Sequence, residues 1–475
     1  MPDATGTAFK IVEVERYERP VELRLPFRFG VVTLTQCPQA FARVRIELPD
    51  GKGAWGAAAE MMAPKWFDKN LDLSNEDNFD QLRRITKIAH EAYLSDATAA
   101  TAFGHFARHH DAHCQAAAAQ GFNPLLASYG PALLDRAVLD ALCRSAGTSF
   151  YQAVQGNLAG IGTGRAEFDG LGIDAFLKSL RPATSIEARH TVGLVDAIGT
   201  IAPSDRVNDG LPETLREVVQ AYGHRYFKLK VAGHIEADLA RLTEIAAVLD
   251  TELSAPYFAS LDGNEQYADA AGIAELMVRL RQSPKLARLY ESILFIEQPI
   301  NRKTALDVDL RTEAQALGKP VIIDESDGEL STFVQARARG YSGVSSKTCK
   351  GIYKSILNAA RCEAWNVEQN KVRYFMSAED LTTQAGLSVQ QDLALVNLLG
   401  IKHVERNGHH YVNGMTALPQ QEQQAFLAAH GDMYERSHGT VRLRIEGGRI
   451  ALASLDGTGY ASGAMPMFDA MQRLN

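Results

Sequence analysis

The sequence is poor in cysteine, and its five cysteines are scattered. They never form a C-x-x-C pair, and their number is odd: Cys37, Cys114, Cys143, Cys349 and Cys362. This pattern argues against a disulfide framework and against a cysteine-based structural zinc site. Unpaired thiols are typical of a reducing compartment, so we expect a cytoplasmic protein.

The sequence also lacks blocks of basic residues and long apolar runs. The formal net charge is -8, with 49 Lys and Arg against 57 Asp and Glu. We therefore expect no nucleic-acid partner. No stretch has the apolar length that crosses a bilayer, and the charged N-terminus lacks the apolar core of a signal peptide. We accordingly expect no membrane partner.

The 475 residues that are present suffice for two domains. Residues 9–60 alternate like strands, and residues 75–150 have helical periodicity. After about residue 185, eight short apolar runs alternate with amphipathic stretches, which indicates a parallel barrel or a doubly wound sheet. We predict two domains: an N-terminal module over 1–150, completed by about 410–475, and a domain of alternating strands and helices over 151–409, which the family resemblance described below implies to be the capping domain and the catalytic barrel.

The C-terminal segment GTVRLRIEGGRIALASLDG, residues 439–457, alternates again. Its EGG sequence predicts the turn of a β-hairpin. We expect this hairpin to pack against the N-terminal module.

Acidic residues stand at the ends of three successive predicted strands. Asp262 ends YFASLDG, Glu297 ends SILFIEQ, and Asp324 ends PVIIDES. Because the C-terminal ends of parallel barrel strands open on one face, we expect these carboxylates to converge. Converging carboxylates repel one another unless a cation binds between them, and oxygen ligands suit Mg²⁺. The sequence therefore predicts a Mg²⁺ site, with Mn²⁺ as the alternative ion.

Two other predicted strands bring lysines to the same mouth. Lys228 and Lys230 lie two residues apart in HRYFKLKVAG, so their side chains share one face, and Lys347 ends GYSGVSSK. Burial and a nearby divalent cation both lower the pKa of a lysine, which allows it to act as a general base. Such a base beside Mg²⁺ suits abstraction of the proton alpha to a substrate carboxylate, through an enediolate that Mg²⁺ stabilises.

These motifs, in this order, resemble the enolase superfamily, in particular its muconate-lactonizing-enzyme-like subgroup. The matching segments are KLK, DGN, IEQP, IDES and SSKTCKG, and LPFRFG is similar to the family's entrance loop in the capping domain. That this superfamily combines a Lys or His base with Mg²⁺ is a known property of the family. The resemblance implies an α/β fold, a (β/α)7β TIM-like barrel with an α+β capping domain.

The resemblance also implies a role for individual residues. Asp262, Glu297 and Asp324 would be the metal ligands. Lys230 would be one acid/base and Lys347 the other, on the opposite face of the substrate. Lys228 would tune Lys230 or contact the substrate carboxylate. Asn264 and Glu325 would lie behind the ligands and contact them.

Two differences between this sequence and the motifs of known subgroups narrow the choice of subgroup. The mandelate-racemase-like subgroup has a histidine on strand seven paired with an aspartate on strand six, whereas FMSAEDLTT at 375–383 contains no histidine and strand six carries Lys347. Dipeptide epimerases have a D-x-D motif on strand eight, which HVERNGHHY at 403–411 lacks. Both the mandelate-racemase-like subgroup and a dipeptide substrate are therefore disfavoured.

Lysines on both faces predict a 1,1-proton transfer, so a racemase or epimerase is the leading interpretation, together with a cycloisomerase, which uses the same enediolate. The alternative is an acid dehydratase or lyase, which would eliminate water through the same enediolate. A non-catalytic metal-binding paralogue is disfavoured because the set of ligands and bases is complete.

The partner that we expect is a small-molecule carboxylate. The cap segments FRFGVVTLT and EMMAPKW are apolar and aromatic, so we expect Phe29, Thr33 and Met62 to contact the substrate. Oligomers are common among barrels of this kind, and we expect a homo-oligomer whose number of subunits the sequence leaves open.

One further motif, GHFARHHDAHC, invites a metal interpretation. It places His105, His109 and His113 at i, i+4 and i+8 on one helical face. Zinc would need a fourth ligand that we do not find. We therefore interpret these histidines as a solvated helix face.

Overall fold

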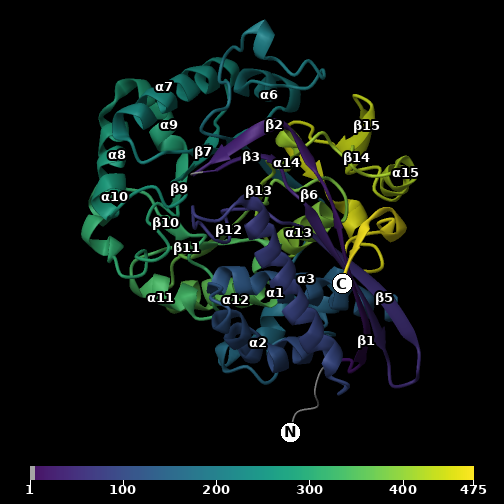
Figure 1. The fold of residues 1–475 in the computed structure, drawn as a ribbon. Coiled ribbons are helices and arrows are strands. Elements are labelled where there is room, and N and C mark those ends of the chain that lie inside the picture. The colour runs from purple at the N-terminus through teal and green to yellow at the C-terminus, as the bar shows by residue number, and fades with distance from the viewer. Residues whose placement is uncertain (1–5, 31) are drawn as a thin grey trace.

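The chain folds into an eight-stranded parallel barrel and an α+β layer that covers the mouth of the barrel. The computed structural model describes residues 6–30 and 32–475. Figure 1 shows the barrel helices on the left and the N-terminal sheet with its helices at the lower right. The predicted (β/α)7β barrel with an α+β cap is therefore confirmed.

The cap contains an antiparallel sheet with the strand order β17-β1-β4-β5. Its strands are β1 (Lys10–Arg19), β4 (Gln39–Glu47), β5 (Gly53–Met61) and β17 (Gln472–Leu474). The C-terminal strand β17 pairs with β1, so the first and the last strand of the described chain lie side by side in one sheet. A separate hairpin, β2 (Glu22–Phe29) with β3 (Val32–Gln36), extends toward the barrel (Figure 1).

The cap helices begin at recognisable N-cap residues. The helices are α1 (Asn75–Ser95), α2 (Ala102–Ala119), α3 (Pro124–Ser145) and α4 (Phe150–Gln155). Ser74 and Asp77 form a capping box at the start of α1. Asn123 caps α3, and Pro124 occupies its first turn, where the missing N–H costs nothing.

Helix α3 packs directly on the cap sheet because β5 has no side chain at Gly56. A Cβ atom at Gly56 would lie 2.2 Å from the carbonyl oxygen of Ala137 and 2.2 Å from the amide nitrogen of Ala141. The other side of α3 contacts α1, α2 and the segment after Lys347. Helix α3 thus forms the buried layer between cap and barrel.

The barrel strands follow one another around the sheet in the order β12-β11-β10-β9-β8-β7-β6-β13, and all pairs are parallel. The strands are β6 (Ser185–Val192), β7 (Tyr226–Lys230), β8 (Phe258–Asp262), β9 (Ile293–Glu297), β10 (Val321–Ile323), β11 (Gly343–Ser346), β12 (Phe375–Ala378) and β13 (His403–Glu405). Strands β7 and β11 are the second and the sixth of eight. They therefore face each other across the barrel.

The helices between these strands form the outer layer seen at the left of Figure 1. They are α6 (Leu215–Tyr222), α7 (Ile235–Glu252), α8 (Ala270–Gln282), α9 (Ala287–Ser292), α10 (Ala314–Leu317), α11 (Thr332–Ala338), α12 (Ile352–Glu368) and α13 (Leu387–Leu398), with α5 (Ile173–Ser179) preceding β6. The division into domains at residues 150 and 409 stays a prediction.

The barrel closes between β12 and β13 through side chains. These two strands are in contact but end the hydrogen-bonded path of the sheet, as far as the described residues go. The guanidinium of Arg189, on β6, crosses this seam and donates to Ser377 Oγ at 3.0 Å and to the Ala378 carbonyl at 2.9 Å. Arg189 is fully buried, so a charged side chain that is shielded from solvent bridges the gap between β12 and β13.

The predicted C-terminal hairpin is wrong. Strand β15 (Thr440–Leu443) pairs with β14 (Tyr434–Ser437), and β16 (Arg449–Ala451) pairs antiparallel with the barrel strand β6. The EGG turn does form, with Gly447 and Gly448 at positive φ and one antiparallel bridge between Glu446 and Arg449, but the ladder does not continue because the two flanking strands pair with other strands. The remaining elements of this region are α14 (Gly408–Tyr411) and α15 (Gln420–Ala429).

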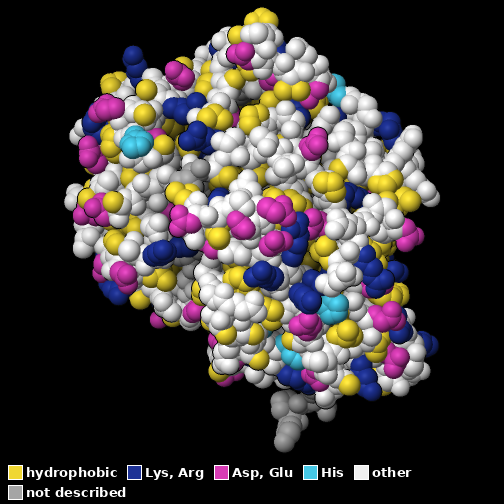
Figure 2. All heavy atoms as spheres, viewed as in Figure 1, with side chains coloured by type: hydrophobic (Ala, Val, Ile, Leu, Met, Phe, Trp, Pro, Cys, Tyr) yellow, Lys and Arg dark blue, Asp and Glu magenta, His cyan; other side chains and the backbone are white. Residues whose placement is uncertain are grey.

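On the face that Figure 2 shows, acidic and basic side chains are interspersed, and no large patch carries charge of one sign. Among the described residues, none of the helices is both long enough and apolar enough to cross a membrane.

Candidate active site

The strand ends of the barrel bring the predicted carboxylates and lysines together. In the sheet register, Lys230 is opposite Asp262, and Asp262 is opposite Glu297. Lys228, Lys230, Asp262, Glu297 and Asp324 are all at least nine-tenths buried. The polar cluster therefore lies inside the barrel mouth and not at its outer surface.

Lys230 lies between two of the predicted residues. Its Nζ is 2.5 Å from Asp262 Oδ2 and 2.7 Å from Asn264 Oδ1. Asn264 in turn donates from Nδ2 to Glu325 Oε1 at 3.0 Å. Asn264 thus connects Lys230 to Glu325, and its left-handed backbone (φ 37°) is a conformation that asparagine tolerates better than most residues.

Lys228 lies at the centre of the carboxylates. Its Nζ pairs with Asp262 at 2.8 Å, Glu297 at 3.1 Å, Glu379 at 2.6 Å and Glu405 at 3.2 Å. Burial lowers the pKa of Lys228, but the four carboxylates outweigh burial and raise this pKa well above its usual value.

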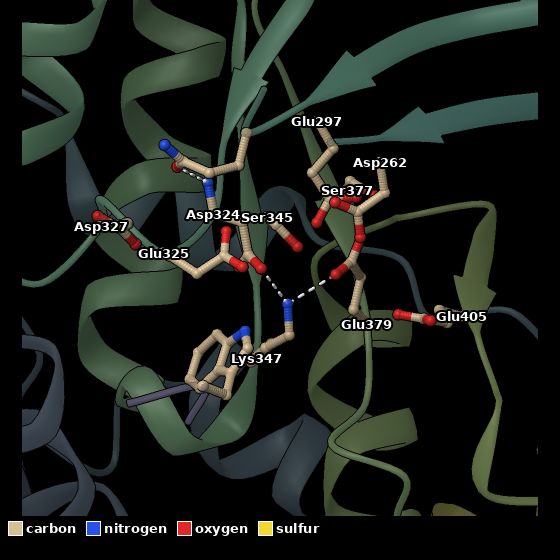
Figure 3. A network of polar contacts seen from close by, with 12 residues as sticks. Asp262, Glu297, Asp324, Glu325, Asp327, Ser345, Lys347, Ser377, Glu379 and Glu405 are labelled. Atoms are coloured by element: carbon tan, nitrogen blue, oxygen red, sulfur yellow. Dashed lines mark hydrogen bonds and ion pairs between the residues drawn. The ribbon is translucent and has the colours of Figure 1, made fainter. Parts of the chain in front are cut away.

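Lys347 enters from the opposite wall, directly after β11. Its Nζ is 2.7 Å from Asp324 Oδ2 and 2.6 Å from Glu379 Oε2, and Figure 3 shows these two carboxylates reaching the ammonium from two sides. The indole of Trp66, from the cap, lies 5.0 Å from Nζ. Burial lowers the pKa of Lys347, yet Asp324 and Glu379 raise it overall. The lowered lysine pKa expected from the sequence is thus not what these neighbours produce by themselves.

Two acidic residues of this site were missed in the sequence. Glu379 follows β12, and Glu405 ends β13. Both occupy the same strand-end position as the predicted ligands, in FMSAED and HVER. The rule that located Asp262, Glu297 and Asp324 would have located these two as well, had it been applied to the last two strands.

Lys350 is a third missed residue. Its Nζ donates to the Asp324 carbonyl at 2.7 Å, to Asp324 Oδ1 at 2.8 Å and to the Ser345 carbonyl at 2.8 Å. All three donors of this ammonium are thereby used. Lys350 therefore holds the Asp324 carboxylate in place and has no donor left for a substrate.

The carboxylates fit a hard divalent cation. One oxygen each from Glu297, Asp324 and Glu379 lies within 4.8 Å of the others, and Asp262 is the strand neighbour of Glu297. Glu297 Oε2 is buried without a hydrogen-bond partner, although Lys228 Nζ is 3.1 Å away. Burial and the adjacent Glu379 raise the pKa of Glu297 well above its usual value. A dense set of oxygen donors with an unused buried oxygen is what Mg²⁺ prefers.

Glu325 directly follows Asp324, and its carboxylate is buried beside that of Asp324 (Figure 3). Burial and the neighbouring Asp324 and Glu265 raise the pKa of Glu325 to about 7, and its Oε2 has no hydrogen-bond partner. Glu325 contacts the site only through Asn264.

A small cavity opens beside the lysines and is covered by the cap. Phe27, Phe29, Ala63 and Trp66 line it from the cap side, together with the three lysines Lys228, Lys230 and Lys347 from the barrel. Of the predicted substrate contacts, Phe29 lines this cavity. Thr33 is exposed on β3, and Met62 is buried in the cap; neither lines the cavity.

The histidines of α2 do not form a solvated face, so that prediction is wrong. His105 and His113 are buried, and their Nε2 atoms bond to the carbonyls of Phe9 at 3.0 Å and Ala127 at 2.9 Å. The reason is that α2 packs with its histidine face against α3 and against Phe9, the residue before β1, rather than toward water.

The comparisons with known proteins agree with this fold. Residues 210–462 match the family model of the enolase C-terminal domain-like proteins, which covers more than half of the chain. No curated protein sequence matches.

Three solved structures illustrate the likeness of fold. An enolase from Bradyrhizobium complexed with magnesium and mandelic acid is 17% identical, with a TM-score of 0.59, and the alignment covers 99% of both chains. A muconate lactonizing enzyme from Pseudomonas fluorescens complexed with muconolactone is 16% identical, with a TM-score of 0.59, covering 97% of this chain and 98% of that one. A dipeptide epimerase from Enterococcus faecalis complexed with Mg and a dipeptide is 14% identical, with a TM-score of 0.59, covering 95% and 99%. At these identities the likeness establishes the fold.

Proposed function

Since the chain belongs to the enolase superfamily, in its mandelate racemase and muconate lactonizing enzyme branch, we propose that it is a Mg²⁺-dependent enzyme that moves the proton alpha to a substrate carboxylate. Racemisation, epimerisation or cycloisomerisation is the reaction class that its bases fit best.

One observation carries this proposal: two lysines face each other across one cavity. Lys230 comes from β7 and Lys347 from the end of β11, which are four strands apart in an eight-stranded barrel. A planar intermediate between them would have an ammonium or amine on each face. One lysine can then remove the proton from one face while the other returns a proton to the opposite face.

The carboxylates Asp262, Glu297 and Asp324 would hold the magnesium ion, with Glu379 beside them. When bound there, Mg²⁺ supplies stabilisation of the negative charge that develops on the substrate carboxylate. A divalent cation among these acids also reverses the local charge that Lys347 experiences, which favours its neutral, basic form. The magnesium in the Bradyrhizobium and Enterococcus structures supports this choice of ion.

The surrounding residues position the two bases. Asn264 accepts from Lys230, and the Trp66 ring lies against the Lys347 ammonium. Both contacts fix the direction in which a proton is transferred, because a base must lie within hydrogen-bond reach of the carbon that it serves. Lys228, which contacts four carboxylates, would keep its charge and attract the substrate carboxylate.

The cavity lining points to a small carboxylate with an apolar substituent. Phe27, Phe29, Trp66 and Leu381 contribute apolar surface, and charged groups occur on the barrel side. The mandelic acid and muconolactone bound in two of the similar structures belong to this class of compound.

The test is α-proton exchange in D₂O. The purified protein with Mg²⁺ is incubated with single enantiomers of a panel of α-substituted carboxylic acids, and the products are analysed by mass spectrometry and chiral chromatography. We expect one added mass unit and conversion to the other stereoisomer. Lys230→Ala and Lys347→Ala should each abolish the conversion, by a factor of about 10²–10⁴, while exchange of one enantiomer survives in each variant.

The matched control is Lys402→Ala, an exposed lysine that precedes β13 at the other end of the barrel. It should behave like the wild type. Interconversion that persists in either lysine variant would contradict the assignment of the bases. Loss of water from a β-hydroxy acid, in place of interconversion, would favour the dehydratase or lyase alternative.

A further inference from the structure

Three histidines distant in the sequence meet outside the barrel. His190 lies on β6, His224 precedes β7, and His409 lies on α14. One ring nitrogen from each lies within 4.8 Å of the others. The ring centroids are 5.4 Å apart for His190 and His224, 6.0 Å for His190 and His409, and 5.5 Å for His224 and His409.

Each of these rings has a buried nitrogen without a hydrogen-bond partner. The atoms are His190 Nδ1, His224 Nε2 and His409 Nε2. Three unpaired polar atoms in one place are costly, because buried nitrogen atoms normally find a partner. A cation bound by their lone pairs would satisfy all three at once.

The hydrogen bonds of the other ring nitrogens fix which atoms carry lone pairs. His224 Nδ1 is 3.0 Å from the Ala188 carbonyl, and His409 Nδ1 bonds to the Arg406 carbonyl. A carbonyl only accepts, so both Nδ1 atoms carry the proton and both Nε2 atoms are unprotonated. A histidine held by a backbone carbonyl in this way is the usual arrangement behind a metal-bound imidazole.

The histidines are also uncharged, as ligands must be. Burial lowers the pKa of His224 to about 4 and lowers the pKa of His190 and His409 well below the usual value. The guanidinium of Arg24, which acts on His409, makes a two-point pair with Asp209 at 2.5 and 2.9 Å.

We propose that His190, His224 and His409 form a binding site for a transition-metal ion of the zinc class, separate from the carboxylate and lysine centre. Imidazole nitrogens suit Zn²⁺, which binds them at about 2.0–2.1 Å, so that two ligands of a tetrahedral ion are roughly 3.4 Å apart. From 4.8 Å, small rotations of the rings reach that spacing. Three protein ligands leave the fourth position to water or another group.

The site is independent of the active centre because of strand alternation. Arg189 and Thr191, which flank His190 on β6, point into the barrel and contact Ser377 and Glu405. His190 therefore points out of the barrel. No residue of the proposed magnesium site belongs to the histidine group.

The three ligands come from the region of three neighbouring strands, β13, β6 and β7, which belong to the two ends of the barrel sequence. β6 is the first barrel strand, His224 leads into the second, and α14 follows the last. A metal ion that joins them would tie the beginning of the barrel to its end. Its binding would stabilise the fold, since ligands that bind only the folded state raise stability.

A second histidine group, Asp96 with His105 and His109, is a weaker candidate. Its Asp96 carboxylate already pairs with Arg108, so the guanidinium already balances the negative charge that would attract a metal ion.

The experiment uses the full chain, stripped with a chelator and then kept in excess Mg²⁺ so that the carboxylate site is occupied by Mg²⁺. Zn²⁺ is titrated against a chromophoric chelator, and Co²⁺ is titrated by its visible absorption. We expect one Zn²⁺ per chain and a tetrahedral Co²⁺ spectrum. His224→Gln should weaken Zn²⁺ binding about 100-fold or more. Zn²⁺ should raise the melting temperature of the wild type but not of this variant.

The matched control is His113→Gln, a buried histidine that bonds to a carbonyl outside the group. It should bind Zn²⁺ as the wild type does. A wild type that binds no Zn²⁺ in excess Mg²⁺, or a His224→Gln variant that binds equally well, would overturn the proposal. Should this variant not fold, anomalous scattering at the zinc edge from wild-type crystals decides: a peak among the three rings supports the site, and its absence refutes it.

Discussion

The Thr348 hydroxyl donates a 2.9 Å hydrogen bond to the Glu60 carboxylate, and this bond joins the barrel to the cap one residue after Lys347. Glu60 also pairs with Arg136 at 3.0 Å, and all three side chains are buried. Burial raises the pKa of Glu60, while Arg136 acts in the opposite direction. The buried hydrogen bond between Thr348 and Glu60 thus fixes the position of the neighbouring Lys347 relative to the cap sheet.

Thr348→Val should reduce both stability and the rate of proton transfer. The substitution keeps the shape but removes a donor to a charged group, which costs about 1.5–3 kcal/mol in the free energy of unfolding. Chemical denaturation measures this loss, and Thr348→Ser should recover most of it. An unchanged stability of the valine variant would show that the bond contributes nothing.

Arg19→Met should destabilise the protein strongly. Arg19 on β1 makes two bonds to Glu422 on α15, at 3.0 and 2.7 Å, and both side chains are buried. Removing the arginine leaves a buried unpaired carboxylate, which costs about 3–5 kcal/mol.

The control for this variant is Arg45→Met. Arg45 pairs with Glu13 at 2.5 Å, but these side chains are 33% and 46% exposed. Exposed pairs contribute about 0–1 kcal/mol. Equal losses in the two variants, measured by urea unfolding, would contradict the importance of burial.

The stability of the protein should decline between about pH 4 and pH 8 because of Asp135. Burial raises the pKa of Asp135 to about 8 in the folded protein, where Tyr93 bonds to it at 2.6 Å. An unfolded chain releases this proton near pH 4. The folded state therefore binds more protons in this window, and stability falls as pH rises, by on the order of 1 kcal/mol per pH unit.

Asp135→Asn should flatten this dependence and leave the variant relatively more stable at pH 8 than at pH 5. The measurement is urea unfolding at several pH values, with exposed Asp72→Asn as the control. Parallel curves for the wild type and the Asp135 variant would show that Asp135 titrates normally.

Glu379→Gln should weaken Mg²⁺ binding at least about 10-fold, because it removes one of the carboxylates that converge within 4.8 Å. Glu405→Gln should stay within about 3-fold, because Glu405 pairs with Lys228 at 3.2 Å but does not belong to that group. Isothermal titration with Mg²⁺ distinguishes the two. A stronger effect at Glu405 would place the ion on the other side of Lys228.

The sequence was sufficient for the alternation of strands and helices and for most of the residues at the strand ends, while the resemblance to the enolase superfamily supplied the barrel. Alternation places Lys228 and Lys230 on one face, and the common direction of parallel strands brings Asp262, Glu297 and Asp324 together. Both rules depend on the periodic pattern of residues within short segments, and this pattern can be seen in a single sequence.

The rest depends on contacts between distant segments. The pairing of β16 with β6 and the role of Lys350 at Asp324 follow from tertiary packing that no local pattern specifies. The histidines 190, 224 and 409 have no common spacing, and only the fold brings them together. Glu379 was missed for another reason: an acid after a strand also looks like an ordinary loop residue.

The side-chain closure between β12 and β13 has a consequence for how the barrel opens. Edge amides that have no partner in a neighbouring strand exchange with solvent at a lower energetic cost than amides within a ladder. Glu379 and Glu405 emerge from these two edges. Side chains bridge the gap between them: Arg189 on β6 bonds to Ser377 on β12, and Arg406, after β13, pairs with Asp380, after β12. The barrel can therefore open between β12 and β13 without breaking backbone hydrogen bonds between strands. We expect the amides of these two edges to exchange with solvent fastest among the eight barrel strands.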